Sequence, residues 1–286
     1  MDYDRAYSQD IRPLKVAIVN LMPKKEETEL QLIRMLSNTA LQIDISLIRM
    51  GSHQSKNTSP VHLKRFYRTY EEIKDEKFDA MVITGAPVER FEYEEIIYWS
   101  ELKDVFEFAR TQVFSTLFIC WSAQAGLYHF YDIDNQLKKD KIFGIYEYEK
   151  KAEDVLIKGF DDKFYIPQSR YSLVGLDQVK DRKDLDLLIG SEETGGVLMA
   201  SKDKRFIFNF GHWEYDRDTL KNEYIRDLEK EEEIKPPINY FKDDDPNKDI
   251  IVRWRSAGNL FFANWINYCV YQETPYNIEE ISEKIL

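Results

Sequence analysis

Short apolar runs alternate with helical patterns through the first 120 residues of the chain. The runs are rich in branched side chains and are bounded by polar or turn-forming residues, as in strands that are buried on both faces. Two intervening stretches, 26–36 and 99–110, carry apolar residues at helical spacing. This alternation predicts an α/β fold with a mostly parallel sheet flanked by helices. The predicted buried strands are 14–20, 41–48, 80–84 and 114–119.

Beyond Gly126 the pattern changes to shorter strand candidates joined by charged or glycine-containing turns, which predicts antiparallel strands added to the sheet. A polar, acidic stretch at 227–246 interrupts the apolar pattern, and helical spacing resumes at 259–272. We expect a single α/β domain, residues 1–286, with a C-terminal helical extension. The short strand candidates are 141–147, 155–157, 187–189, 197–200 and 205–209.

The charge balance limits the classes of partner. A formal net charge of -12 at pH 7 argues against nucleic acid or an anionic membrane, because binding to either needs clustered Lys and Arg. No apolar run approaches the roughly 18 residues of a membrane span, and the N-terminus lacks the pattern of a secretory signal. The two cysteines, Cys120 and Cys269, fit neither a disulfide framework nor a zinc-binding spacing. We therefore expect a cytoplasmic protein without a metal site.

Cys120 stands where the apolar run 114–119 gives way to a helical segment of small residues. A thiol at such a turn lies at the top of a sheet, beside a helix N-terminus whose N–H groups favour a thiolate and a developing oxyanion. Further along, His212 precedes Glu214 by two residues, and such a pair can supply a general base and the group that orients it. Cys120, His212 and Glu214 therefore predict nucleophilic thiol chemistry, whereas Cys269 is interpreted as a core residue.

This pattern resembles the class I glutamine amidotransferases, which share a glutamine at the position of Gln124 and a His-x-Glu pair at the positions of His212 and Glu214. Their elbow has the sequence Gly-x-Cys-x-Gly, whereas Phe118 and Ser122 flank Cys120 here. The resemblance implies a class I glutamine amidotransferase-like, flavodoxin-like fold. The absent glycines argue against glutamine hydrolysis, an alternative that ammonia release from glutamine would decide.

A larger set of motifs extends over residues 11–276. They are Pro13-Leu14-Lys15-Val16, Asn20-Leu21-Met22-Pro23-Lys24-Lys25, Thr84-Gly85-Ala86-Pro87, Cys120-Trp121-Ser122-Ala123-Gln124-Ala125-Gly126-Leu127-Tyr128, Gly159-Phe160-Asp161-Asp162, Ser169-Arg170, Gly211-His212, Trp254-Arg255-Ser256 and Asn264-Trp265. In identity and order these motifs are similar to those of the homoserine O-acyltransferase family of methionine biosynthesis, the homoserine trans-succinylase type.

That resemblance implies a two-step acyl transfer. Cys120 would attack the thioester of an acyl-CoA to form an acyl-enzyme, with His212 as general base and Glu214 orienting it. The acyl group would then pass to a hydroxyl, which gives ping-pong kinetics. No cofactor is implied, because acetyl-CoA would be a co-substrate. Of the other matching positions, Lys25 and the Trp121 N–H would stabilise the oxyanion, and Lys141, Ser169 and Arg226 would bind the acceptor.

Glu89 bears on the choice of acyl donor. In the family, glycine at this position accompanies the use of succinyl-CoA, and glutamate accompanies the use of acetyl-CoA. A carboxylate would also repel the free carboxylate of a succinyl group. Both considerations favour acetyl transfer over succinyl transfer.

The acceptor is expected to be L-homoserine, with L-serine as the alternative. The two differ by one methylene, which a pocket discriminates by only about 1 to 3 kcal/mol. Gln168, Trp213 and Ala257 depart from the family's usual residues near the pocket. The changes at Gln168 and Ala257 leave open a non-catalytic sensor that binds acyl-CoA or an amino acid. A homodimer is the default expectation for a metabolic enzyme of this kind.

Overall fold

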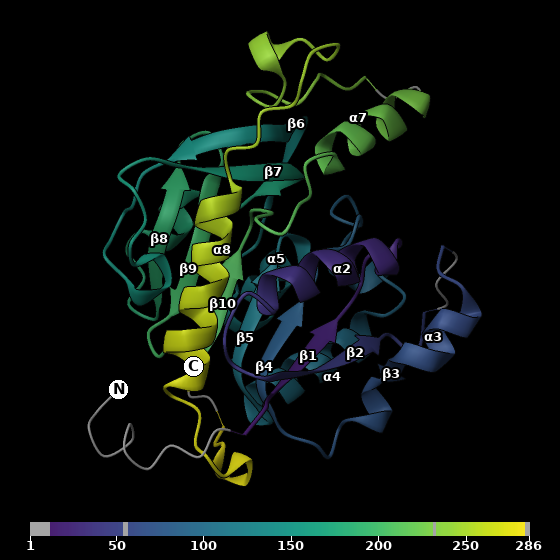
Figure 1. Ribbon diagram of the computed structural model, residues 1–286, viewed down its shortest axis with the longest axis vertical. Helices are drawn as coiled ribbons and strands as arrows, with labels where there is room; N and C mark the ends of the chain where they lie inside the picture. The colour runs from purple at the N-terminus through teal and green to yellow at the C-terminus, as the bar shows by residue number, and fades with distance from the viewer. Residues whose placement is uncertain (1–11, 54–56, 231–232, 284–286) are drawn as a thin grey trace.

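The computed structural model describes residues 12–53, 57–230 and 233–283. These residues form an eight-stranded sheet in which six neighbouring strands run parallel, while β9 pairs antiparallel with both of its neighbours (Figure 1). The predicted mostly parallel sheet with antiparallel additions is confirmed. In spatial order the strands are β3 (Tyr67–Thr69), β2 (Ile43–Arg49), β1 (Leu14–Val19), β4 (Phe78–Ile83), β5 (Val113–Ile119), β10 (Phe206–Asn209), β9 (Gly195–Ser201) and β8 (Leu185–Ser191).

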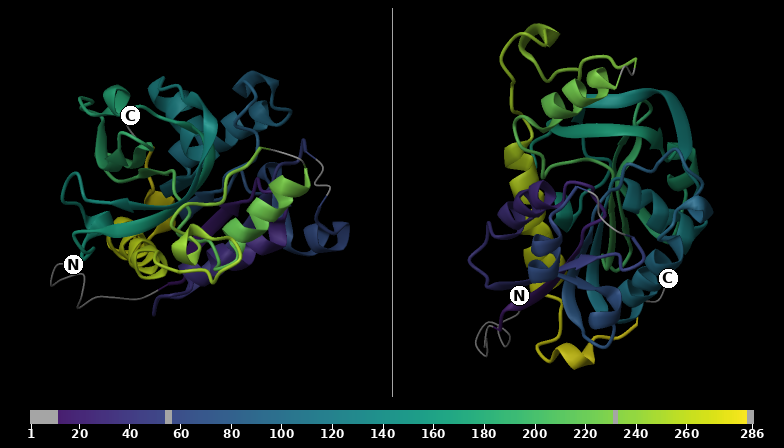
Figure 2. Two further views of the ribbon diagram at one scale, coloured as in Figure 1. Left: turned by 90° about the horizontal axis from the view of Figure 1, so that it is seen from above. Right: turned by 90° about the vertical axis from the view of Figure 1, so that its right-hand side faces the viewer.

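Helices cover both faces of the sheet. On β1, Val16 and Ile18 belong to one buried cluster, and Ala17 and Val19 belong to the other, because successive side chains of a strand point to opposite faces. Figures 1 and 2 show α2 and α8 on one side of the sheet and α4 and α5 on the other. The bounds are α2 (Lys25–Leu36), α8 (Arg255–Asn264) with the π-helical continuation Trp265–Tyr271, α4 (Trp99–Thr111) and α5 (Trp121–Tyr131).

A second, two-stranded antiparallel sheet is formed by β6 (Gln136–Tyr148) and β7 (Phe164–Leu173). In Figure 1 it lies across the upper end of the main sheet, beside α7 (Thr219–Glu229). The segment after α7 returns to this sheet, since Ile145 N donates to Ile238 O at 2.9 Å and Ile238 N donates to Phe143 O at 3.1 Å. The stretch 227–246, predicted as a polar interruption of the apolar pattern, therefore begins in the last turn of α7. Its residue Ile238 is hydrogen-bonded to β6.

One predicted strand is wrong. Val155–Ile157 is a single turn of 3-10 helix, in which Asp154 Oδ1 accepts a hydrogen bond from Leu156 N at 3.0 Å. Leu156 and Ile157 are fully buried, so their apolar character reflects burial rather than strand pairing. The remaining short elements are α3 (Pro60–Phe66), α6 (Leu176–Val179) and 3-10 turns at Tyr70–Glu72, Tyr93–Glu95, Lys242–Asp244 and Ile278–Glu280.

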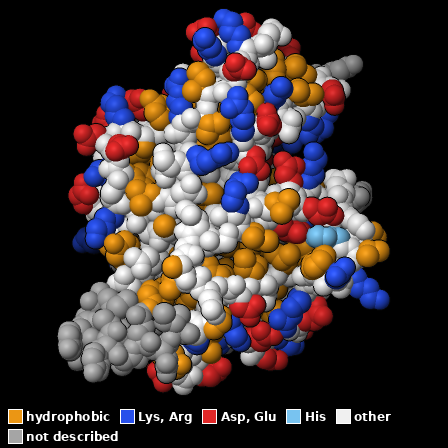
Figure 3. Space-filling view, in the orientation of Figure 1, with side chains coloured by type: hydrophobic (Ala, Val, Ile, Leu, Met, Phe, Trp, Pro, Cys, Tyr) orange, Lys and Arg blue, Asp and Glu red, His pale blue; other side chains and the backbone are white. Residues whose placement is uncertain are grey.

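Acidic and basic side chains are interspersed over the face shown in Figure 3. Among the described residues, none of the helices combines the length and the apolar character needed to span a bilayer.

Gly144 allows the closest approach between β6 and the returning segment, which gives a test of this architecture. Its φ is 134°, and a side-chain carbon there would lie 2.4 Å from the backbone N and O of Ile238. Gly144→Ala is expected to lower the free energy of unfolding by about 3 kcal/mol, from backbone strain and overpacking together. Gly159, with φ 80° but no atom closer than 3.5 Å, is the matched control, and Gly159→Ala is expected to cost only about 1 kcal/mol.

Urea denaturation followed by circular dichroism measures both variants. Equal losses of stability would contradict the close packing of Ile238 on β6.

Candidate active site

The predicted turn between strand and helix is present at Cys120, which follows β5 and directly precedes α5. Its φ of 55° and ψ of -115° are unusual for a residue with a side chain, and neighbouring groups hold this conformation. The Ser122 hydroxyl accepts a hydrogen bond from Ile119 N at 2.9 Å and donates to Ile83 O at 2.6 Å. A side chain at Gly85 would lie 3.2 Å from Cys120 Cβ. The elbow therefore forms without its flanking glycines, and a serine ties it to β4.

His212 and Glu214 meet Cys120 from the loop after β10. His212 interacts with Cys120 and directs Nδ1 to Glu214 Oε1 at 2.7 Å. The backbone of the loop is attached to β7, since His212 N donates to Pro167 O at 2.9 Å. Burial lowers the pKa of His212, but the opposing charges of Glu214 and Cys120 outweigh burial and raise the pKa well above its usual value. The geometry favours an imidazolium that is held between a carboxylate and a thiol.

The two residues predicted to stabilise an oxyanion occupy the same edge of the sheet. Trp121 is the first residue of α5, so its backbone N–H lacks an intrahelical acceptor and adjoins the thiol. Lys25 begins α2, which follows β1, and β4 lies between β1 and β5. The Lys25 ammonium donates to Asn20 O and to Met22 O, the latter at 3.2 Å. Burial lowers the pKa of Lys25 to about 8, although the negative charge of Glu29 opposes this.

The three predicted acceptor-binding residues come from different elements and converge on α7. Lys141 of β6 lies 3.0 Å from Asp227 Oδ2 and 3.5 Å from Glu223 Oε2. Ser169 of β7 hydrogen-bonds Glu223, and Arg226 pairs with Asp227 Oδ1 at 2.6 Å. Of these, Arg226 is the most open, with 48% of its side chain exposed. The structure thus brings together residues that lie up to 85 positions apart in the chain (141 to 226).

Glu223 and Asp227 were missed in the sequence. They stand four residues apart on one face of α7. In the sequence, their position on either side of Arg226 was the only feature that pointed to them. Glu223 also connects the predicted acceptor-binding residues to the loop that carries His212. Its Oε1 accepts a hydrogen bond from the Tyr215 hydroxyl at 2.9 Å, and the Tyr215 ring stacks on His212 with a centroid separation of 4.2 Å.

A buried cation, Arg170, was also missed as a functional candidate. Its guanidinium is fully buried and donates to Gln168 Oε1 at 3.1 Å, Thr194 O at 2.8 Å and Ser172 O. Burial lowers the pKa of Arg170, and the charge of Cys120 acts in the opposite direction. None of these three acceptors is a carboxylate, so within the described residues the buried Arg170 charge is held by neutral oxygens.

Glu89 is partly buried on the loop that starts beside Cys120 at Gly85. The next residue, Arg90, stacks on the Tyr171 ring at 4.0 Å, and Lys141 lies 5.9 Å from the same ring. The loop that carries Glu89 therefore extends from the thiol to the acceptor-binding residues.

The three residues that depart from the family pattern pack into the scaffold. Gln168 is buried and bridges Tyr148 and Arg170. Trp213 packs on Phe261 with a centroid separation of 4.4 Å, and Ala257 is a partly buried residue of α8 that contacts the same apolar cluster. In the described ranges, His, Cys, Asp and Glu side chains nowhere gather in a group of three that could hold a metal ion.

The fold is shared with solved structures of low sequence identity. A glutamine amidotransferase from Thermotoga maritima aligns with a TM-score of 0.55 at 15% identity, over 89% of this chain and 97% of that one. A glutamine amidotransferase from Methylobacillus flagellatus aligns with a TM-score of 0.54 at 11% identity, over 90% of this chain and 95% of that one. These likenesses establish the amidotransferase-like fold that the elbow and the His-x-Glu pair implied.

Sequence comparison identifies the family. The model of the homoserine O-succinyltransferase family matches residues 1–276. A homoserine O-acetyltransferase from Streptococcus thermophilus is 50% identical over 284 residues, covering 99% of this chain and 90% of that protein. Another, from Clostridium novyi, is 54% identical over 273 residues, covering 95% of this chain and 90% of that protein. The chain therefore belongs to the homoserine O-succinyltransferase family.

Proposed function

We propose that this protein is a homoserine O-acetyltransferase of methionine biosynthesis, which transfers an acetyl group from acetyl-CoA to the side-chain hydroxyl of L-homoserine. The observation that carries the chemistry is the placement of His212 between Cys120 at the strained elbow and Glu214, whose Oε1 lies 2.7 Å from His212 Nδ1. Relatives of about half-identical sequence and nearly equal length, named as homoserine O-acetyltransferases, support the substrate assignment. No cofactor is needed, because acetyl-CoA is consumed as a co-substrate.

In the first half-reaction the Cys120 thiolate attacks the thioester carbonyl. A new C–S bond forms to Cys120, the C–S bond to CoA breaks, and the departing CoA sulfur takes a proton from the His212 imidazolium. The Trp121 N–H and the Lys25 ammonium stabilise the oxyanion that develops on the carbonyl oxygen. Exchange of one thioester for another keeps the acetyl group activated for transfer.

In the second half-reaction the acceptor hydroxyl gives its proton to neutral His212 and attacks the acetyl carbon. The ester C–O bond forms and the bond to Cys120 breaks, which restores the thiolate. The α-carboxylate of the amino acid suits a bidentate grip by Arg226, and the α-ammonium suits the carboxylate of Glu223. Because Tyr215 joins Glu223 to His212, the acceptor is bound next to the base that activates it.

The alternatives have less support. The names of the relatives favour homoserine over serine as acceptor. The names of the relatives likewise favour acyl transfer over glutamine hydrolysis. A non-catalytic sensor would not need a base and its orienting carboxylate to be aligned on the thiol.

A panel of donors and acceptors tests the substrate assignment. With acetyl-CoA, L-homoserine should give a kcat/KM at least about tenfold above that of L-serine, because a pocket that fits the longer side chain loses methylene contacts with the shorter one. Thiol release from CoA, followed with a chromogenic disulfide, measures both reactions. Turnover with L-serine alone, or release of ammonia from L-glutamine, would contradict the assignment.

A covalent intermediate is expected on Cys120. Incubation with acetyl-CoA in the absence of acceptor should add one acetyl group, because the thiol is the attacking group and no hydroxyl is present to accept the acetyl. Peptide mass spectrometry should find the adduct in wild type and in Cys269→Ala, whose thiol is buried away from the site, but not in Cys120→Ser. An unmodified wild-type protein, or initial-rate lines that intersect, would contradict the ping-pong mechanism.

Glu89 is expected to disfavour succinyl-CoA through its charge as well as its size. Glu89→Gln removes the charge at nearly constant volume and should raise the ratio of succinyl-CoA to acetyl-CoA kcat/KM by at least about tenfold, by relieving carboxylate repulsion. Glu89→Gly also opens space and should raise the ratio further. Glu92→Gln, an exposed charge on the same loop, is the control and should leave the ratio unchanged.

A further inference from the structure

A chain of buried polar groups leads from the end of β1 to the protein surface. Asn20 Nδ2 donates to the Tyr67 hydroxyl at 2.9 Å, and that hydroxyl donates to Glu29 Oε1. Beyond it, Glu29 Oε2 lies 3.0 Å from His62 Nε2. Glu29 is 6% exposed, whereas His62 has 23% of its side chain exposed. The Glu29 carboxylate is therefore fixed between a buried phenol and a histidine that reaches solvent.

Lys25 lies at the inner end of this chain. Asn20 binds it twice, because Asn20 Nδ2 donates to Lys25 O at 3.1 Å and the Lys25 ammonium donates to Asn20 O. The ammonium also lies 5.9 Å from the centroid of the Tyr67 ring. An ammonium has three donors, and the carbonyls of Asn20 and Met22 accept two of them. In the described part of the chain no third acceptor is recorded, so one donor remains for a ligand.

The charges around Lys25 come from four elements. They are Glu29 and Glu26 of α2, Arg49 of β2, His62 of α3 and Tyr67 of β3. Burial lowers the pKa of Lys25 to about 8, Glu29 raises it, and Arg49 lowers it again. Burial and the hydrogen bond to Glu29 raise the pKa of Tyr67, so the phenol remains a neutral donor. Glu29 is thus the buried anion that offsets the desolvation of Lys25.

We propose that Glu29 is a positioning residue for Lys25: its carboxylate, fixed by His62 and by the Tyr67 hydroxyl that also bonds Asn20, holds the Lys25 ammonium in place at the end of β1. The inference rests on the proposed function, in which this ammonium faces the carbonyl oxygen of the acyl donor. Glu29 itself does not touch the substrate. It acts through Lys25, by supplying the opposite charge that a buried ammonium needs.

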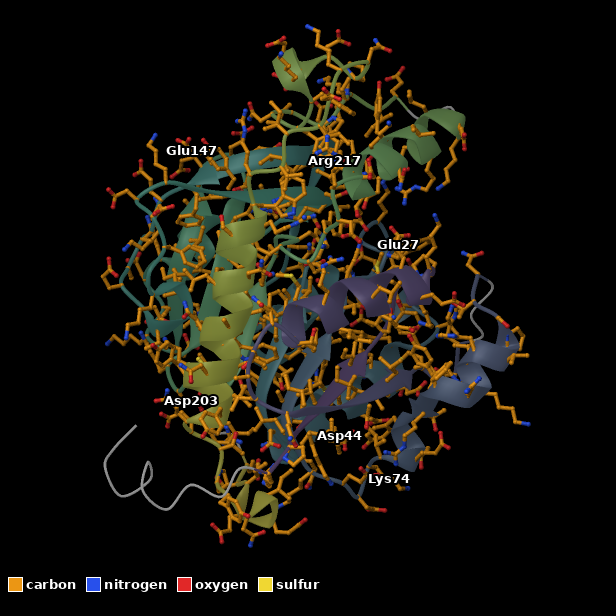
Figure 4. The ribbon with its side chains drawn as sticks, in the orientation of Figure 1. Glu27, Asp44, Lys74, Glu147, Asp203 and Arg217 are labelled. Atoms are coloured by element: carbon orange, nitrogen blue, oxygen red, sulfur yellow. The ribbon has the colours of Figure 1, made fainter. Side chains whose placement is uncertain are left out.

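The ionisation of Lys25 can be followed without turnover. Protein labelled with ¹³C-lysine is titrated by ¹H–¹³C NMR, and the Lys25 signal is the one missing from Lys25→Arg. The wild-type midpoint is expected at about 8. Glu29→Gln, which keeps an acceptor for Tyr67 but removes the charge, should lower the midpoint by roughly one pH unit. Glu27→Gln, exposed on the same helix (Figure 4), is the matched control and should leave it in place.

The pH profile of kcat supplies a second readout. The Lys25 ammonium and the His212 imidazolium are both active forms, so activity falls as pH rises through their pKa values, and Glu29→Gln should shift the Lys25 part of this fall to lower pH by the same amount. A purely structural role would lower kcat at every pH without moving the fall. Should Glu29→Gln not fold, Glu29→Asp withdraws the charge by one methylene and should move the midpoint in the same direction by less.

A midpoint that stays at the wild-type value in both Glu29 variants would overturn the inference, as would an equal shift in Glu27→Gln. Lys25→Met separates this inference from the proposed function. If Lys25→Met abolishes turnover while Glu29→Gln leaves the midpoint unchanged, only the role of Glu29 fails. If Lys25→Met leaves turnover intact, the oxyanion role of Lys25 fails first, whatever the NMR midpoint shows.

Discussion

The backbone conformation of Cys120 is the constraint on which the rest of the site depends. A residue with a side chain in this region costs about 1 to 2 kcal/mol, which surrounding contacts must offset. Cys120 N donates to Asn209 O at 2.7 Å, which continues the pairing of β5 with β10, and Ser122 attaches the turn to β4. The same turn starts α5, so the thiol and the Trp121 N–H are set by one local structure. The contacts that hold Cys120 in its strained backbone conformation therefore also fix the position of its thiol.

Buried charges are a second constraint on the site, because each is stabilised by the groups that surround it. His212 lies between Cys120 and Glu214, while Lys141 is matched by Glu223 and Asp227. Removing one member of such a set leaves an uncompensated buried charge, which is more costly than losing the pair. Tyr215 contacts both sets, through its ring on His212 and its hydroxyl on Glu223. The electrostatics around Cys120 and around the predicted acceptor-binding residues are therefore linked.

The sequence was most informative where hydrophobic periodicity and a local motif coincided. The parallel strands around 14–20 and 114–119 and the elbow at Cys120 were predictable, because buried parallel strands are continuous apolar runs. β7 was missed because its sequence, with Pro167, Gln168, Ser169 and Arg170, is polar and lacks alternation. Gln168 and Arg170 are buried and hydrogen-bonded to each other, and Arg170 also donates to the distant Thr194 O; such tertiary pairing leaves no local pattern. Glu223 and Asp227 were hidden for the same reason, since acidic residues on a helix are usually solvated.

The thiol and the predicted acceptor-binding residues lie on different parts of the fold, the main sheet and the elements added to it. The elbow lies on the eight-stranded sheet, whereas Lys141, Ser169 and Arg226 come from β6, β7 and α7, outside that sheet. A site on such additions can change its acceptor while the thiol remains in place. The two parts are nevertheless not independent here, because Pro167 of β7 accepts the hydrogen bond from His212 N. A change in β7 that reshapes the predicted acceptor-binding residues would therefore also act on His212 through this hydrogen bond.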